Sequence, residues 1–300
     1  MKKKAYRLLL VGGAVCLLAL WSASSLEARQ LQVVTTFSIL QDFVQQVGGR
    51  EVAVHALVPL GADPHTWEPS PREAGLVAKA DLLVANGAAF DDWLLPVMRS
   101  AAGPHVSLIL ASEGLSLLEA HTHHGHTHAH DPHLWLSVPN AVAYVERITQ
   151  ALQELSPDRA DYFAENAARY IQELWALDGR LAAELAEIPP ENRIIVTYHN
   201  AFSYLAERYG FEVVEFLVHN PEAEPNPRDL GRLVELVKQL EKPAVFTEPQ
   251  LNSGTRYIQA LAQEAGAQVF TLYSDSLSEA VPTYVEMMEY NLQVLLEALQ

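Results

Sequence analysis

Three histidines lie in local sequences that could direct an imidazole toward a metal ion. His65 lies in GADPHTWEP and His133 in DPHLWL, so both share the pattern Asp-Pro-His-x-Trp. Proline restricts the turn before each histidine, so less conformational entropy is lost when a ligand orders the side chain. His199 directly follows a predicted strand, in IVTYHN, and α/β proteins bind ligands at the carboxyl ends of their strands. Imidazole is a common ligand for transition metals, so the three positions predict a metal site.

Two carboxylates could complete this site, because a tetrahedral zinc shell needs a fourth ligand. Asp275 lies in LYSDSL, after the last predicted strand, and Glu248 lies in FTEP, after the preceding one. Glu248 could be a ligand, an acceptor for a histidine N–H, or a salt-bridge partner. We favour Asp275 as the ligand on its position alone. The set then takes two ligands from each half of the chain, which predicts a metal in the cleft between two lobes.

A second group of histidines fills a biased segment, residues 119–132. A polar, His-rich tract cannot build a core, and this composition favours a low-affinity metal-collecting loop over a solvated or pH-sensitive one. The tract contains His121, His123, His124, His126, His128 and His130.

Composition restricts the function. The 300 residues include 20 Lys+Arg and 37 Asp+Glu, for a formal net charge of −17. This acidic balance argues against nucleic-acid binding, which needs clustered basic residues, and against a polybasic membrane-surface patch. Cys16 is the single cysteine, so the remaining chain is predicted to have no disulfide and no cysteine-based metal site.

The first 28 residues are predicted to be a signal peptide. Basic residues at the start precede an apolar stretch over 8–21 and then small residues, which is the layout of an export signal. Cys16 lies inside the apolar stretch. It is either a lipid anchor or an apolar filler, and the apolar run that continues after it favours the filler. We therefore expect an exported protein, periplasmic or otherwise extracytoplasmic, free or tethered through Cys16.

Strand and helix patterns alternate along the chain, which predicts an α/β fold. We expect an N-terminal lobe over residues 29–155, a long linking helix over 156–188 and a C-terminal lobe over 189–300. Ser38 is an expected cap for the helix that follows the first strand. The predicted strands are Leu31–Phe37, Val52–Val58, Asp81–Ala85, Val106–Leu110, Arg193–Tyr198, Phe211–Val218, Ala244–Thr247 and Val269–Tyr273.

Five motifs together resemble a known family. They are GADPHTWEPSP, ADLLVANG, DPHLWL, TYHNAFSYLAERYG and VFTEPQ, and they run through most of the chain after the signal. The chain is identified by them as similar to the metal-binding cluster (cluster A-I) of ABC-transporter substrate-binding proteins, in particular the zinc-binding members. The resemblance implies two α/β lobes bridged by a single long helix, with the metal between them.

By motif, His65, His133 and His199 match the family's three metal-ligand positions, and Asp275 matches its C-terminal carboxylate position. Manganese and iron binders of the family commonly carry a carboxylate where this chain has His199. Imidazole suits zinc and oxygen-rich shells suit manganese, so the resemblance favours zinc, as does the His-rich loop. Some zinc members lack the C-terminal aspartate as a ligand, so Asp275 leaves mixed zinc and manganese binding open.

The resulting hypothesis is a monomeric, high-affinity zinc receptor that delivers Zn²⁺ to a membrane permease driven by a separate ATPase subunit. Its alternatives are a manganese or mixed receptor, a metal buffer based on the His-rich tract, and a metallohydrolase. The hydrolase is disfavoured because Asp275 would fill the position that catalytic zinc keeps open, and no HExxH motif exists. We therefore expect a protein that is not an enzyme.

Overall fold

The computed structural model describes residues 29–119, 130–218, 225–251 and 254–300, and the side chains of all of these except 214–217. Leu31–Gln300 form one compact unit. The predicted signal peptide and Cys16 lie outside the described residues. Within the described part, no helix has both the length and the apolar character that crossing a bilayer requires.

The N-terminal lobe is built on a four-stranded parallel sheet in the order β2-β1-β3-β4. Its strands are short and rich in Leu and Val, and β3 is buried along its whole length, as expected where both faces of a parallel sheet are covered. The strands are β1 (Leu31–Thr35), β2 (Val52–Ala56), β3 (Leu82–Ala85) and β4 (Ser107–Leu110), and the helices are α2 (Ser38–Gly48), α3 (Pro71–Val77), α4 (Leu95–Ala101) and α5 (Val138–Leu155).

The C-terminal lobe repeats this topology, with a parallel sheet in the order β6-β5-β7-β8. In each sheet the second strand of the lobe lies on one side of the first strand, and the third strand lies on its other side. Open α/β sheets bind ligands at such switch points, outside the carboxyl ends of the strands. The strands are β5 (Ile194–His199), β6 (Glu212–Val218), β7 (Ala244–Thr247) and β8 (Gln268–Thr271), and the helices are α7 (Ser203–Tyr209), α8 (Pro227–Val237), α9 (Gly254–Ala265) and α10 (Tyr284–Leu299).

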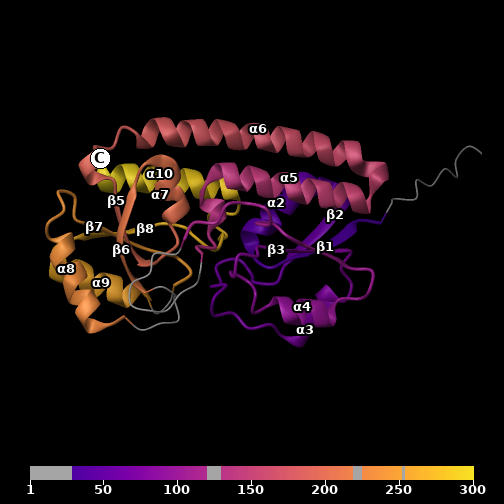
Figure 1. Cartoon of the computed structure of the whole chain (residues 1–300), viewed down its shortest axis with the longest axis horizontal. Helices are drawn as coiled ribbons and strands as arrows, with labels where there is room; N and C mark the ends of the chain where they lie inside the picture. Colours follow the sequence, from indigo (N-terminus) through magenta and orange to yellow (C-terminus); the bar gives the residue numbers. More distant parts are fainter. Residues whose placement is uncertain (1–28, 120–129, 219–224, 252–253) are drawn as a thin grey trace, which may run out of the picture. The chain divides into compact units, whose positions relative to one another are not determined.

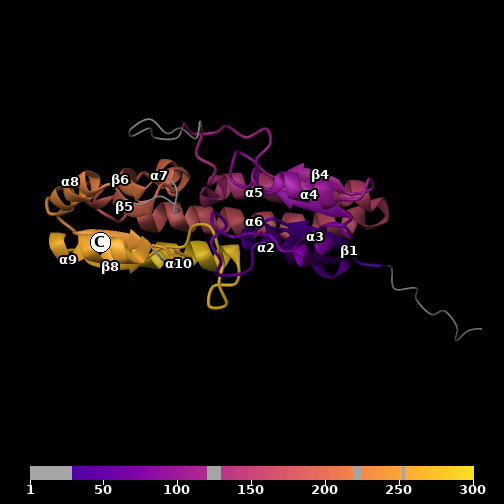
Figure 2. The same ribbon diagram turned by 90° about the horizontal axis from the view of Figure 1, so that it is seen from below.

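A single long helix, α6 (Ala160–Leu185), runs past both sheets (Figures 1 and 2). Its 26 residues span about 39 Å at 1.5 Å per residue. The helix packs against α2 and α5 of the first lobe and against α7 and α10 of the second. Its buried side chains recur every three or four residues, which places them on one face; they include Phe163, Ala167, Tyr170, Leu174, Leu177 and Leu181.

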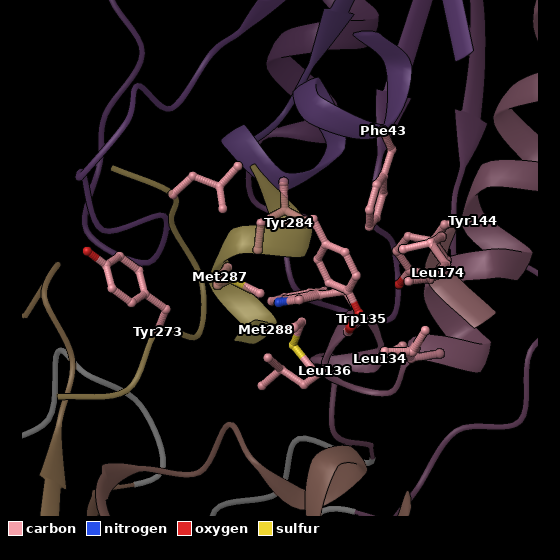
Figure 3. Packing of buried hydrophobic residues seen from close by; sticks show 14 of the residues in the cluster. Phe43, Leu134, Trp135, Leu136, Tyr144, Leu174, Tyr273, Tyr284, Met287 and Met288 are labelled. Carbon is pink, nitrogen blue, oxygen red and sulfur yellow. Dashed lines mark hydrogen bonds between the residues drawn. The ribbon is translucent and has the colours of Figure 1, made fainter. Parts of the chain in front are cut away.

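One hydrophobic cluster continues through both lobes and the long helix. In Figure 3, Trp135 lies among side chains from α2, α5, α6 and α10, including Phe43, Tyr144 and Tyr284. Trp135 and Tyr284 are fully buried, and the Tyr284 hydroxyl donates a hydrogen bond to the Trp135 carbonyl oxygen at 2.6 Å. The predicted fold class is confirmed: two α/β lobes share one long helix.

The cap predicted for the helix after β1 is wrong. Phe37, not Ser38, precedes the first turn of α2, and no side chain caps that turn. The Ser38 hydroxyl instead accepts a hydrogen bond from the Leu277 N–H at 2.9 Å, so it joins α2 to the C-terminal lobe. Because a serine hydroxyl satisfies long-range and local partners equally well, local sequence could not distinguish these two roles.

Candidate metal centre

Two equivalent turns present the histidines of the N-terminal lobe. His65 lies in the loop between β2 and α3, and His133 lies just before the short 3-10 turn Leu134–Leu136. The His65 N–H donates to Asp63 Oδ1 and the His133 N–H donates to Asp131 Oδ1, each at 2.9 Å. Each aspartate thus closes a side-chain turn over the intervening proline, which gives both histidines the same backbone anchor.

The C-terminal lobe supplies its residues from strand ends. His199 is the last residue of β5, Glu248 is the first residue after β7, and Asp275 lies in the loop after β8. His199 Nδ1 lies 2.8 Å from Glu248 Oε1. When this nitrogen donates to the carboxylate, the lone pair of Nε2 is left for a metal ion. The switch point between β5 and β7 therefore carries an oriented imidazole.

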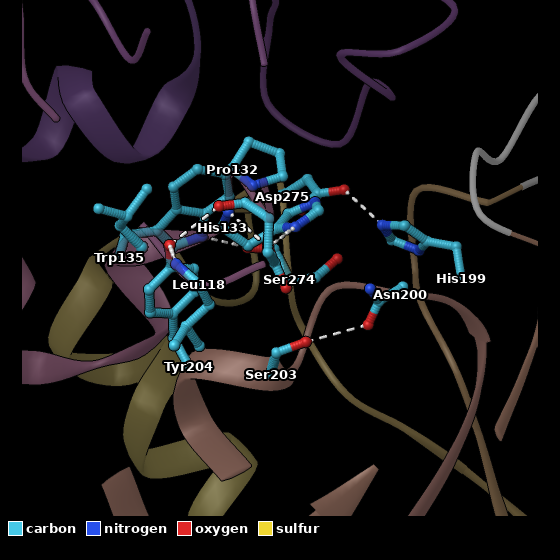
Figure 4. Close-up of polar contacts among 12 residues, drawn as sticks. Leu118, Pro132, His133, Trp135, His199, Asn200, Ser203, Tyr204, Ser274 and Asp275 are labelled. Atoms are coloured by element: carbon cyan, nitrogen blue, oxygen red, sulfur yellow. Dashed lines mark hydrogen bonds and ion pairs between the residues drawn. The ribbon is translucent and has the colours of Figure 1, made fainter. Parts of the chain in front are cut away.

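The structure brings the four side chains predicted as metal ligands together. Figure 4 labels three of them, His133, His199 and Asp275. Asp275 lies at the centre, with His65 Nε2 at 3.4 Å and His199 Nε2 at 3.3 Å from its Oδ2, and His133 Nε2 at 3.5 Å from its Oδ1. One ligand atom from each residue lies within 4.8 Å of the others. His133, His199 and Asp275 are buried, and the His65 side chain retains 16% exposure.

The buried polar atoms of this group lack ordinary partners. The three Nε2 atoms and both Asp275 carboxylate oxygens have no hydrogen bond with acceptable geometry to any described residue. Buried polar atoms that remain unpaired are costly, and a fold retains them where a ligand satisfies them. Three imidazole nitrogens and one carboxylate are a donor set that suits a divalent transition metal.

A polar network holds the donors in place. Glu248 Oε2 accepts a hydrogen bond from the Ser274 hydroxyl and another from Gln250 Nε2 at 3.2 Å. The Trp135 indole N–H donates to the Ser274 carbonyl oxygen at 2.8 Å. On the N-terminal side, His133 Nδ1 lies 2.8 Å from Asp131 Oδ1. Two of the three imidazoles therefore have a carboxylate behind them, as metal-ligating histidines commonly do.

The pKa values of His199 and Asp275 are shifted in opposite directions. Burial alone would lower the pKa of His199, but the carboxylates of Glu248 and Asp275 outweigh it and raise this pKa well above its usual value. Burial alone would raise the pKa of Asp275, but His133, His199 and His65 outweigh it and hold this pKa well below its usual value. Both shifts favour the charged forms, an ionised Asp275 beside a protonated His199, and a cation bound at these atoms would compete with that proton.

The remaining predicted residues have different outcomes. Glu248 contacts His199 and lies outside the group of four, and its geometry fits two of its three predicted roles, acceptor for a histidine N–H and salt-bridge partner. Of the His-rich tract, His130 is described: it is exposed and forms a backbone bridge with Glu119. His121, His123, His124, His126 and His128 lie outside the described residues.

Sequence reasoning missed the partner of His133. Asp131 precedes that histidine by two residues, as Asp63 precedes His65, so the repeated pattern itself was the available signal. It also missed Ser274 and Gln250. Ser274 bonds to Glu248 and Gln250 across 26 and 24 residues of sequence, so local sequence did not reveal these contacts.

Comparisons with known proteins agree with this geometry. The family model described as ZnuA, zinc-uptake complex component A, periplasmic, matches residues 33–298. The manganese-binding lipoprotein MntA of Halalkalibacterium halodurans is 32% identical over 93% of this chain and 91% of its own length. The zinc-binding lipoprotein AdcA of Streptococcus pneumoniae is 33% identical over 89% of this chain and 55% of its own. The crystal structure of ZnuA superposes with a TM-score of 0.80 and 28% identity, covering 90% of this chain and 99% of that one.

Proposed function

This chain belongs to the zinc-uptake component A family of ABC-transporter substrate-binding proteins, and on that basis we propose that it is an extracytoplasmic receptor that binds Zn²⁺ with high affinity. Members of this family bind divalent metals for transport and are not enzymes. The receptor transfers its ion to a membrane permease that is driven by a separate ATPase subunit. The cargo is the ion itself, so the residues of the site bind, release and select it.

One observation carries the zinc assignment: the group contains three imidazole nitrogens and a single carboxylate, His65, His133, His199 and Asp275. Four protein donors fill a tetrahedral zinc shell. Two of the imidazoles are oriented by the carboxylates of Asp131 and Glu248, and such partners raise the basicity of the ligand nitrogen. We assign Glu248 this supporting role and assign the four residues as the ligands.

Manganese is the second candidate because neither oxygen of the Asp275 carboxylate forms a hydrogen bond with a described residue. A carboxylate that binds through both oxygens would give a more oxygen-rich shell, which suits Mn²⁺. A relative with 32% identity is named as manganese-binding. The three nitrogens favour zinc over manganese, because a given nitrogen site binds Zn²⁺ with higher affinity than Mn²⁺.

The remaining parts of the proposal concern the chain outside the site. Residues 1–28 act as an export signal, and the protein is either free or tethered outside the cytoplasm through Cys16. The His-rich segment 119–132 collects metal at low affinity, and the receptor is a monomer. A version lacking residues 121–130 separates collection from tight binding, because the four proposed ligands all lie outside the deletion.

The deciding experiment combines elemental analysis with titration. We expect the purified protein to contain zinc, and the version without residues 121–130 to bind one Zn²⁺ more tightly than Mn²⁺. His199→Ala should weaken Zn²⁺ binding by more than about 100-fold, because even outer partners of metal ligands contribute 10- to 100-fold. His105→Ala, at an exposed histidine, is the matched control and should bind as the parent does. Equal affinity for the two metals would contradict the zinc assignment.

A further inference from the structure

The loop between β3 and α4 has a backbone conformation that requires an explanation. Gly87, Ala88 and Ala89 all have positive φ angles, of 78°, 52° and 68°. For alanine this left-handed region costs roughly 1–2 kcal/mol per residue. Such conformations persist where the surrounding structure over-determines them, and they concentrate at functional positions. The loop is therefore held in this shape by interactions elsewhere.

Asp91 provides those interactions. Its buried carboxylate accepts hydrogen bonds from the Asn86 N–H at 2.6 Å, the Gly87 N–H at 2.9 Å and the Thr36 hydroxyl at 2.8 Å. Gly87 has no room for a side chain, since a Cβ there would lie 2.9 Å from Ser112 Oγ. Together with the hydrogen bond from the Ser112 N–H to the Asn86 carbonyl oxygen at 3.0 Å, these contacts hold the loop against the residues that follow β1 and β4.

The fixed loop reaches both histidine turns of the N-terminal lobe. Phe90 is 3% exposed, and its ring centroid lies 5.1 Å from that of His65 and 5.8 Å from that of His133, at angles of 80° and 76°. Asn86 Nδ2 donates to the Pro132 carbonyl oxygen at 3.1 Å. One loop therefore contacts two metal-site turns that lie far apart in sequence.

His65 depends most on this contact. The His133 ring has Asp131 at its Nδ1, whereas no described residue forms a hydrogen bond with the His65 ring. The Phe90 ring also packs on Phe37 and Trp135, at 5.0 and 4.9 Å between centroids. The Phe90 side chain that packs against both imidazoles is itself aromatic and offers no oxygen to a cation.

Resting on the proposed function, we propose that Phe90 is a positioning residue that holds the His65 and His133 imidazoles in the geometry of a four-coordinate ion. It thereby selects Zn²⁺ against Mn²⁺. Zinc is satisfied by four donors, whereas manganese favours more oxygen ligands and a larger shell. If the two imidazoles are held less firmly, a water molecule or the second Asp275 oxygen can also bind the ion. Part of the preference for Zn²⁺ over Mn²⁺ is then lost.

The experiment uses the full chain with Phe90→Leu and Phe90→Ala. Affinities for Zn²⁺ and Mn²⁺ are measured by competition, and Co²⁺ is bound as a spectroscopic probe whose visible bands weaken as coordination rises above four. We expect the Zn²⁺/Mn²⁺ affinity ratio to fall by about tenfold, in the range of other partners behind metal ligands, and the Co²⁺ bands to weaken. Phe163→Leu is the control, because Phe163 is equally buried in the same cluster but its ring contact is with Tyr162.

The outcomes separate the two proposals. The parent protein could bind Zn²⁺ tightly while the Phe90 variants keep the same Zn²⁺/Mn²⁺ affinity ratio and the same Co²⁺ spectrum. That result overturns the role of Phe90 and leaves the proposed function intact. A Phe163→Leu variant that changes both readouts as much also overturns that role, because the effect would then be general. Parent protein that binds no Zn²⁺ overturns the proposed function. Phe90→Leu keeps an apolar side chain at the position, so it supplies the result if Phe90→Ala does not fold.

Discussion

The His199 imidazole lies between two carboxylates, so at the residue scale a proton and a metal ion compete for the same nitrogen. Because the two carboxylates outweigh burial and raise its pKa well above the usual value, the metal-free protein keeps this proton to higher pH than an ordinary imidazole does. Zinc binding must release it. We predict that Zn²⁺ affinity rises by about one log unit per pH unit for each displaced proton and keeps rising above the ordinary imidazole pKa. Chelator competition across neutral pH measures this slope.

Glu248→Gln tests the cause of that slope. The amide can still occupy the position beside His199 Nδ1, but it removes the charge that raises the pKa of His199. The region of steep pH dependence should move to lower pH, and the affinity at high pH should fall by about 10- to 100-fold. A pH profile identical to that of the parent would refute the electrostatic role of Glu248.

The sequence could predict which side chains meet at the site and marked Glu248 as a possible supporting residue, but it did not reveal the other residues that support them. His65 and His133 were marked by a repeated pattern, and His199 and Asp275 by their positions after strands. The structure brings these four together, while their role as ligands remains a proposal. Phe90 carried no such mark, since an aromatic residue after a strand is usually core and its contacts with the imidazoles depend on tertiary packing.

At the scale of elements, the stability of the molecule should depend on the buried face of α6. Leu174 is fully buried in the cluster shared by both lobes, so Leu174→Ala leaves a cavity. We predict a loss of about 2–5 kcal/mol in the free energy of unfolding, measured by chemical denaturation. Glu173→Ala, at the exposed neighbouring position, is the control and should change it by less than about 0.5 kcal/mol. Equal effects of the two variants would refute the assigned face.

Element boundaries were predictable to within a few residues, and the exceptions have physical causes. Residues 156–188 were predicted to form one helix, but they contain a 3-10 turn at Pro157–Arg159 followed by α6, Ala160–Leu185. A proline begins the 3-10 turn, and the Pro189–Pro190 pair follows the end of the helical region. Ser38 was misassigned because its hydroxyl bonds to Leu277, a partner 239 residues away that no local pattern reveals.

At the scale of the whole molecule, the continuous core predicts that the region Leu31–Gln300 unfolds as one unit. The cluster includes residues of both lobes, and each lobe supplies two of the four proposed ligands. Zinc at about 1,000 times its dissociation constant should add about 4 kcal/mol and raise a single melting temperature by roughly 10 °C. Scanning calorimetry measures this. Two transitions, with only one shifted by zinc, would show that the lobes unfold separately.

The order of the donors along the chain has a consequence for when the site can form. His65 and His133 belong to the first lobe, while His199 and Asp275 follow strands of the second. A chain that emerges N-terminus first, from a ribosome or through a translocation pore, therefore presents at most two of the four donors until residue 199 has emerged. Capture of the ion waits until β8 and the loop behind it have emerged and docked. If the four residues are the ligands, as proposed, loading is a late event in the maturation of the protein, and a product truncated before Asp275 has only three of the four donors.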